Sequence, residues 1–299
     1  YTAILANAGV SRACAALGHD PDRVQVAIIG AYGSVGRVSA VLAADDFSRL
    51  WLVGNPDNAD HPTLLRRVAG HLLRRALTGP GERGLSRVLT GHLSPILEGD
   101  ATGPAEVMVA YRLRQALATE SDEADEALFR TVASTYQILG LGDPPIRLGS
   151  DAAAAAAACD IIVSATSSAT AVLEPRHLRP GAIVCDVALP PDVSGSARAA
   201  RPDVLVFDGG LARFPMEVAM GFNFGYPPGL GLGCLTETMI LALEGERVDR
   251  SIGRRIDLAD VAHLRLLAER HGFSLGGLRS AGRELTEEDF ARVRRSVQS

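Results

Sequence analysis

Cys234 is the residue of this sequence best placed for covalent chemistry. It follows the glycine-rich run 229–233 and opens an apolar stretch, 235–243, with the pattern of a helix. The N–H groups at the start of a helix carry partial positive charge, which favours the thiolate form of a cysteine. The sequence therefore indicates a nucleophilic thiol at Cys234, with a buried and inert cysteine as the alternative.

Glu237, three residues after Cys234, is the second catalytic candidate. If Cys234 caps the helix, the Glu237 carboxylate can reach back to the Cys234 N–H group, as in a capping box. A carboxylate beside the sulfur would raise the pKa of the thiol, so we do not expect Glu237 to be the activating base. Support of the helix start and a direct role in the site both remain open.

A glycine motif near the start of the sequence has the spacing of a dinucleotide-binding turn. Glycines at 30, 33 and 36 follow an apolar strand-like run and open a helix-like one. The first glycine allows a tight turn, the second lets the backbone approach a pyrophosphate, and the third lets the helix pack on the strand. A plain glycine turn is the alternative. We expect cofactor contacts from Gly30, Tyr32, Gly33, Ser34, Val35, Gly36 and Arg37.

The end of the second strand indicates which cofactor is used. An acidic residue there would bind the ribose 2′-hydroxyl of NAD. The sequence has Gly54, Asn55 and Pro56 at this point, with Asp57 only after the proline. The missing acid favours NADP, with Asn55 at the site. Arg37 is a candidate for the 2′-phosphate, and a surface position is its alternative.

Two later strand ends carry further candidates. Ala165, Thr166 and Ser167 follow one strand, and their small side chains leave space for ribose and nicotinamide. Asp186 ends the next strand, at the edge where open α/β sheets bind ligands. An ordinary polar turn, or the cap of a turn, is the alternative for each of them.

The candidate residues follow the ends of several predicted strands, and a parallel sheet would bring those ends to one edge. Short apolar runs predict strands at 24–30, 50–54, 145–148, 160–166, 182–188 and 204–208. Such runs suit strands covered on both faces, and helix-like segments alternate with them. We expect an α/β fold, a doubly wound Rossmann-like parallel sheet with a helical insertion and C-terminal helices. Helical periodicity is seen at 2–17, 35–44, 64–77, 105–119, 125–139, 257–271 and 284–293.

The same pattern divides the chain into parts. A connecting helix occupies 1–20, and the dinucleotide-binding domain takes 21–55 and 144–215. The segment 56–143 is too long for an ordinary strand-to-strand connection, so it is predicted to be a helical insertion. A C-terminal helical segment, 216–299, carries Cys234.

Composition narrows the class of protein. Hydrophobic residues make up 47% of the 299 residues, enough for a large core, and the net charge of −5 argues against a nucleic-acid partner. Four cysteines without metal-ligand spacing predict neither a zinc site nor disulfides, which fits a reducing cytoplasm. The sequence shows no signal peptide and no membrane-spanning segment.

Several stretches resemble the long-chain acyl-[acyl-carrier-protein] reductases of the cyanobacterial type, which make fatty aldehydes. They are 26–36, 182–190, 207–210 and, most strongly, 233–245 with 257–273. The resemblance implies that Cys234 accepts the acyl group and that NADPH is the reductant. It also implies acyl carrier protein or acyl-CoA as the donor, and an aldehyde-consuming enzyme as a partner. The sheet pattern is similar to glutamyl-tRNA reductases and shikimate dehydrogenases as well.

The expected function is therefore a two-step reduction. The Cys234 thiolate would attack an acyl thioester to give an acyl-enzyme, and hydride from NADPH would release the aldehyde. One alternative is a plain NAD(P)-dependent dehydrogenase acting on an alcohol, ketone or imine, with Cys234 structural. The other is a non-catalytic nucleotide-binding protein that uses the insertion as its interaction surface.

Overall fold

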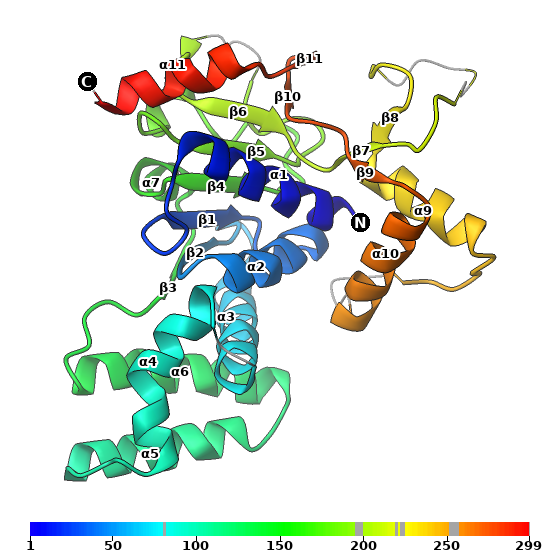
Figure 1. Cartoon of the computed structure of the whole chain (residues 1–299). Helices are drawn as coiled ribbons and strands as arrows, with labels where there is room; N and C mark the ends of the chain where they lie inside the picture. The colour runs from blue at the N-terminus through cyan, green and yellow to red at the C-terminus, as the bar shows by residue number, and fades with distance from the viewer. Residues whose placement is uncertain (80–81, 195–199, 219–220, 222–224, 251–256, 299) are drawn as a thin grey trace.

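The computed structural model describes residues 1–79, 82–194, 200–218, 221, 225–250 and 257–298. At its centre six parallel strands form one sheet in the order β3-β2-β1-β4-β5-β6 (Figure 1). This confirms the α/β class and the parallel sheet flanked by helices, and each strand overlaps the run that predicted it. The strands are β1 (Gln25–Ile29), β2 (Arg49–Val53), β3 (Ile146–Gly149), β4 (Ile161–Ser164), β5 (Ile183–Asp186) and β6 (Leu205–Asp208).

Helices cover both faces of this sheet. Along β1, Val26 and Ile28 belong to one buried apolar cluster, whereas Ala27 and Ile29 belong to another. The first cluster packs under α1 (Thr2–Leu17), α2 (Ser34–Asp46) and α11 (Glu287–Gln298). The second packs under α7 (Ala152–Ala158) and includes Leu173 and Leu178, which lie on either side of a short 3₁₀ turn, Pro175–His177. Burial on both faces explains why the strands have continuous apolar sequences.

Four helices between β2 and β3 form a bundle beside the sheet (Figure 1). The sequence predicted three of them and missed α4, whose pattern is interrupted by Gly91 and Pro95. Its buried leucines, Leu85, Leu89 and Leu93, nevertheless recur every fourth residue. The helices are α3 (His61–Thr78), α4 (Gly84–Glu98), α5 (Pro104–Leu117) and α6 (Asp122–Ile138).

A buried arginine joins three helices of the bundle. Arg74 of α3 donates from Nε to Asp125 of α6 at 2.7 Å, and its other nitrogens donate to the carbonyl oxygens of Ala116 and Leu117 at 3.0 Å. Helices α3 and α6 cross so closely that a Cβ atom on Gly70 would lie 1.8 Å from the Asp125 carbonyl oxygen. The crossing therefore requires glycine at this position.

The part after β6 contains strands that the sequence did not predict. A small antiparallel sheet has the order β8-β7-β9, and β10 pairs with β11 in a hairpin. The glycine-rich run before Cys234 is thus partly strand. The elements are β7 (Leu211–Arg213), β8 (Leu230–Leu232), α9 (Gly233–Leu243), α10 (Leu258–Arg270), β9 (Ser274–Leu275), β10 (Arg279–Ser280) and β11 (Arg283–Glu284). Helices α9 and α10 share a third apolar cluster with the start of α1 and with Val38 and Leu42 of α2.

Candidate ligand-binding site

The turn between β1 and α2 requires glycine at two of its three motif positions. Gly30 has a φ of 81°, and a Cβ atom there would lie 2.5 Å from the Ala165 carbonyl oxygen. A Cβ atom on Gly36 would lie 2.1 Å from the Gly30 carbonyl oxygen. Gly33 is the N-cap of α2, which has no side-chain cap and no acidic residue in its first turn. This helix start suits an anionic group.

A cavity of about 560 Å³ opens over this turn. We call it the glycine-turn cavity. Its lining comes from the carboxyl ends of β1, β2 and β4 and from the start of α7. Seven of the predicted cofactor-binding residues line it: Gly30, Tyr32, Gly33, Asn55, Ala165, Thr166 and Ser167.

The Tyr32 ring lines the glycine-turn cavity on the side of β2 and packs closely against its neighbours. A Cβ atom on Gly54 would lie 2.9 Å from Cε1 of the Tyr32 ring, so the ring lies directly against the backbone. The Tyr32 hydroxyl accepts a hydrogen bond from the Asn55 N–H group at 3.3 Å. The Asn55 side chain in turn accepts from the Asp57 N–H group at 3.0 Å. These bonds tie the end of β2 to the glycine turn.

A second cavity, of about 450 Å³, contains Cys234. We call it the Cys234 cavity. Thr2, Val35, Asp186, Asp208 and Tyr226 are also among its lining residues. Because Val35 belongs to the first turn of α2, the two cavities flank the same helix start.

Cys234 is the exposed cysteine of the four. Burial raises the pKa of the Cys14 thiol to about 11 and that of Cys159 to about 12. Burial raises the pKa of Cys185 as well. The three buried thiols are poor nucleophiles at neutral pH, whereas Cys234 is open to a ligand in its cavity.

The capping box expected at Cys234 does not form. Helix α9 begins at Gly233 with Leu232 as its N-cap, because the Gly233 N–H group bonds the Gly210 carbonyl oxygen at 2.7 Å and β8 runs directly into the helix. Cys234 is thus the second helical residue and Glu237 the fifth, too far along for the box. The Glu237 carboxylate instead accepts a hydrogen bond from the Tyr1 nitrogen at 2.6 Å and lines neither cavity.

Three other predicted residues lie outside both cavities. Arg37 lines neither cavity. Burial and the nearby charge of Arg37 lower the pKa of His71 in α3. Ser34 and Gly36 also lie outside the two linings.

Asp186 lines the Cys234 cavity, but its carboxylate is engaged in hydrogen bonds with backbone N–H groups. It accepts hydrogen bonds from the N–H groups of Ala188 at 3.3 Å, Asp192 at 3.2 Å and Val193 at 3.0 Å. These bonds fold the segment after β5 back over the sheet edge. We therefore assign Asp186 a structural role, in which it fixes the conformation of the segment after β5.

Sequence reasoning missed Asp192, which is fully buried at this edge. Its carboxylate accepts from the Ser164 hydroxyl at 2.6 Å and from the Thr166 hydroxyl at 2.7 Å. The Asp186 carboxylate accepts a hydrogen bond from the Asp192 N–H group, and the Asp192 carboxylate in turn bonds the turn after β4 that lines the glycine-turn cavity. The one available signal was an acid after two prolines that follow a strand.

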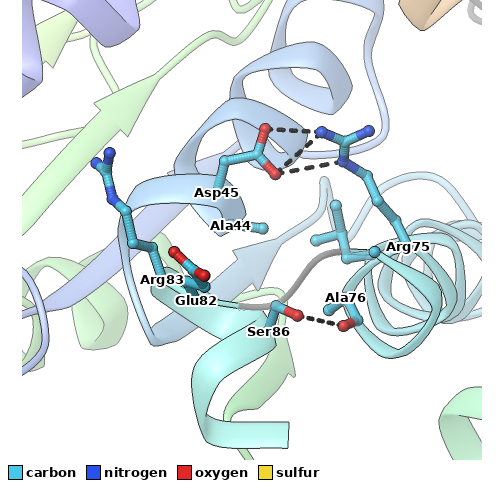
Figure 2. A pocket seen from close by; sticks show the side chains of 9 residues that line it. Ala44, Asp45, Arg75, Ala76, Glu82, Arg83 and Ser86 are labelled. Atoms are coloured by element: carbon cyan, nitrogen blue, oxygen red, sulfur yellow. Dashed lines mark hydrogen bonds and ion pairs between the residues drawn. The ribbon is translucent and has the colours of Figure 1, made fainter. Parts of the chain in front are cut away.

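A further hollow, of about 360 Å³, lies at the other end of α2, where the helical insertion meets it (Figure 2). Figure 2 shows Arg75 forming an ion pair with Asp45, at 2.9 Å, and the Ser86 hydroxyl bonding the Ala76 carbonyl oxygen. These two interactions link α2, α3 and α4 across the hollow. We assign this hollow to the joint between insertion and sheet.

The described part of the chain contains neither a membrane-spanning helix nor a cluster of metal ligands. No helix there is long and apolar enough to cross a membrane. No group of three or more His, Cys, Asp or Glu side chains gathers there as a metal site.

No protein-family profile matches this chain. It is 37% identical over 140 residues to a protein named aminotransferase PigE from a Serratia species. The aligned region is 46% of this chain but 16% of that protein, so the chain matches a small part of a much longer relative.

This relative contradicts the identification as an acyl-[acyl-carrier-protein] reductase. Its name is that of an aminotransferase, so the expected thioester reduction to aldehyde, the NADPH cofactor and the NADP-dependent oxidoreductase class are wrong. The physical reason is that a glycine turn and a thiol at a helix start are compatible with many chemistries. Among the described residues that line the glycine-turn cavity, no arginine is present to hold a 2′-phosphate.

Aminotransferases normally carry pyridoxal phosphate on a lysine, which this chain does not provide. Its 30 basic residues other than histidine are all arginine, and the sequence contains no lysine. A Schiff base with the cofactor needs that amine. The residues present therefore do not fit pyridoxal phosphate as a covalently held group.

Proposed function

We propose that this chain is a unit of an aminotransferase-type enzyme and that it binds a phosphate-bearing nucleotide in the glycine-turn cavity. The phosphates would lie over the start of α2 and the nucleoside over the end of β2. The lysine that transamination requires would come from another polypeptide segment. The observation that carries the proposal is the glycine turn itself, where two glycines are sterically required beneath an open cavity.

The sheet order supports the proposal. Strand order 3-2-1-4-5-6 is that of the Rossmann fold, in which ligands bind at the carboxyl edge where the order reverses. Here the reversal falls between β1 and β4, and both strand ends line the glycine-turn cavity. We therefore favour a Rossmann-like unit over other doubly wound arrangements.

The Cys234 cavity would receive the part of the ligand or substrate beyond the phosphates. It lies across the first turn of α2 from the glycine-turn cavity and carries an accessible thiol. We propose Cys234 as the reactive group that faces the bound molecule. A nucleotide that occupies both cavities should then slow the alkylation of Cys234.

Gly33→Ala tests the proposed phosphate position. A Cβ atom there would lie 3.2 Å from the Gly30 carbonyl oxygen, and the backbone φ of −71° accepts alanine, so the fold should tolerate it. The methyl group would, however, separate a phosphate from the turn. We expect the affinity for ADP-ribose, measured by isothermal titration calorimetry, to fall by about tenfold or more.

Gly91→Ala in α4 is the matched control, because a Cβ atom there would have nothing within 4 Å. It should leave the affinity unchanged. If Gly33→Ala binds ADP-ribose as well as the unchanged protein does, the phosphates do not lie on this turn. If the unchanged protein binds neither ADP-ribose nor ATP, the proposed function is wrong.

A further inference from the structure

The rim of the glycine-turn cavity carries one charge. Among the described residues that line the cavity, Asp57 is the charged one, and it is exposed just after the end of β2. Its position is fixed because its N–H group bonds the Asn55 side chain at 3.0 Å, and Asn55 is held by Tyr32. The proline between them separates Asp57 from the strand in sequence but does not remove it from the cavity.

This rim is where the ribose of a bound nucleotide would lie. In parallel sheets with phosphates on the first helix start, the adenosine ribose extends over the end of the second strand. A carboxylate at that place accepts hydrogen bonds from the ribose hydroxyls. The same carboxylate repels a 2′-phosphate, which adds charge of the same sign.

The described residues of the lining provide no compensating cation. A 2′-phosphate is normally held by an arginine near the end of the second strand. The described residues of the lining include no arginine, and Arg37 lies outside it. The electrostatic balance at the rim therefore favours a free hydroxyl over a phosphate.

We propose that Asp57 makes this site selective for nucleotides with a free ribose 2′-hydroxyl over their 2′-phosphorylated forms. The inference rests on the proposed nucleotide site and adds the class of nucleotide that it takes. It reverses the preference expected from the sequence, in which the acid past the proline counted as absent.

The test compares ADP-ribose with 2′-phospho-ADP-ribose by isothermal titration calorimetry. We expect the unchanged protein to bind ADP-ribose at least about tenfold more tightly. Asp57→Asn removes the charge and keeps the shape, so it should reduce this ratio to about threefold or less, mainly by improving the binding of the 2′-phosphate form.

Asp60→Asn is the matched control, since it removes the same charge three residues further on, outside the lining. It should leave the ratio close to that of the unchanged protein. Equal affinities for the two ligands, or tighter binding of the 2′-phosphate form, would overturn the selectivity while leaving the nucleotide site intact. A ratio that Asp57→Asn does not change would overturn the role of Asp57. Failure of both ligands to bind would reject the proposed function itself.

Discussion

Replacing Asp192 by alanine should destabilise the carboxyl edge of the sheet and weaken nucleotide binding together. The Asp192 carboxylate is fully buried and accepts two short hydroxyl hydrogen bonds, at 2.6 and 2.7 Å. Distances of this length are typical of bonds to an ionised acceptor. Alanine would leave the Ser164 and Thr166 hydroxyls without their acceptor.

The magnitude follows from these two bonds. A hydrogen bond to a charged group contributes about 1.5–3 kcal/mol, so the pair is worth about 3–6 kcal/mol. Thr166 lines the cavity, where water can replace part of what is lost. We therefore expect a loss of about 3 kcal/mol in the free energy of unfolding, near the lower bound of that range. Urea denaturation, read as a shift in midpoint at constant slope, measures it.

Two comparisons make this prediction refutable. Asp192→Asn keeps the shape and one acceptor oxygen, so it should lose less stability than alanine does. Asp100→Ala, at an exposed acid after α4, should change stability by no more than about 0.5 kcal/mol. A loss below about 1 kcal/mol for Asp192→Ala, within the range of one ordinary hydrogen bond, would refute the reasoning. So would unchanged affinity for ADP-ribose.

Three further outcomes are expected. Iodoacetamide at neutral pH should label Cys234 and none of the three buried thiols, as peptide mass spectrometry would show; a second labelled cysteine would contradict the burial. Arg74→Ala should cost about 3–5 kcal/mol in urea unfolding because it removes the arginine partner of the buried Asp125 carboxylate. Arg75→Ala, at an exposed ion pair, should cost less than about 1 kcal/mol. The hydrogen bond from Arg283 holds the pKa of Asp289 below its usual value. The stabilisation that this lowered pKa gives to the folded state is complete above the unfolded-state pKa of the carboxyl group and is lost as the pH falls below about 5. Arg283→Gln should therefore flatten the acid side of a curve of unfolding free energy against pH. An unchanged acid side would argue against the ion pair.

The sheet could be predicted because its strands are buried on both faces. Val26 to Ile29 face two different apolar clusters in alternation, which produces a continuous apolar run in the sequence. The two- and three-residue strands after β6 were missed because so few residues show no period. Helix α4 was missed because Gly91 and Pro95 obscure its spacing, although its buried leucines follow a helical pattern.

The candidate site was predicted in part, and for identifiable reasons. The glycine spacing located Gly30 and Gly33, because their role depends on local backbone geometry. Asp192 could not be located, since its partners Ser164 and Thr166 lie at the end of β4, far from it in the sequence, and no local spacing records that contact. Asp57 was not predicted to contact the ligand because it follows Pro56, beyond the end of β2, yet it lines the cavity. The activity was misassigned because the motifs that were recognised describe binding geometry and not the reaction.

The Cys234 cavity takes residues from almost the whole sequence, from Thr2 to Ala281. The residues that line the glycine-turn cavity, by contrast, all precede Asp192, whose carboxylate holds the turn after β4. Because a chain leaves the ribosome from its N-terminal side, Asp192 and every described residue of that lining are made before Cys234. The Cys234 cavity also needs Ala281, which is made after Cys234. The glycine-turn cavity can therefore form earlier during synthesis than the cavity that contains the accessible thiol.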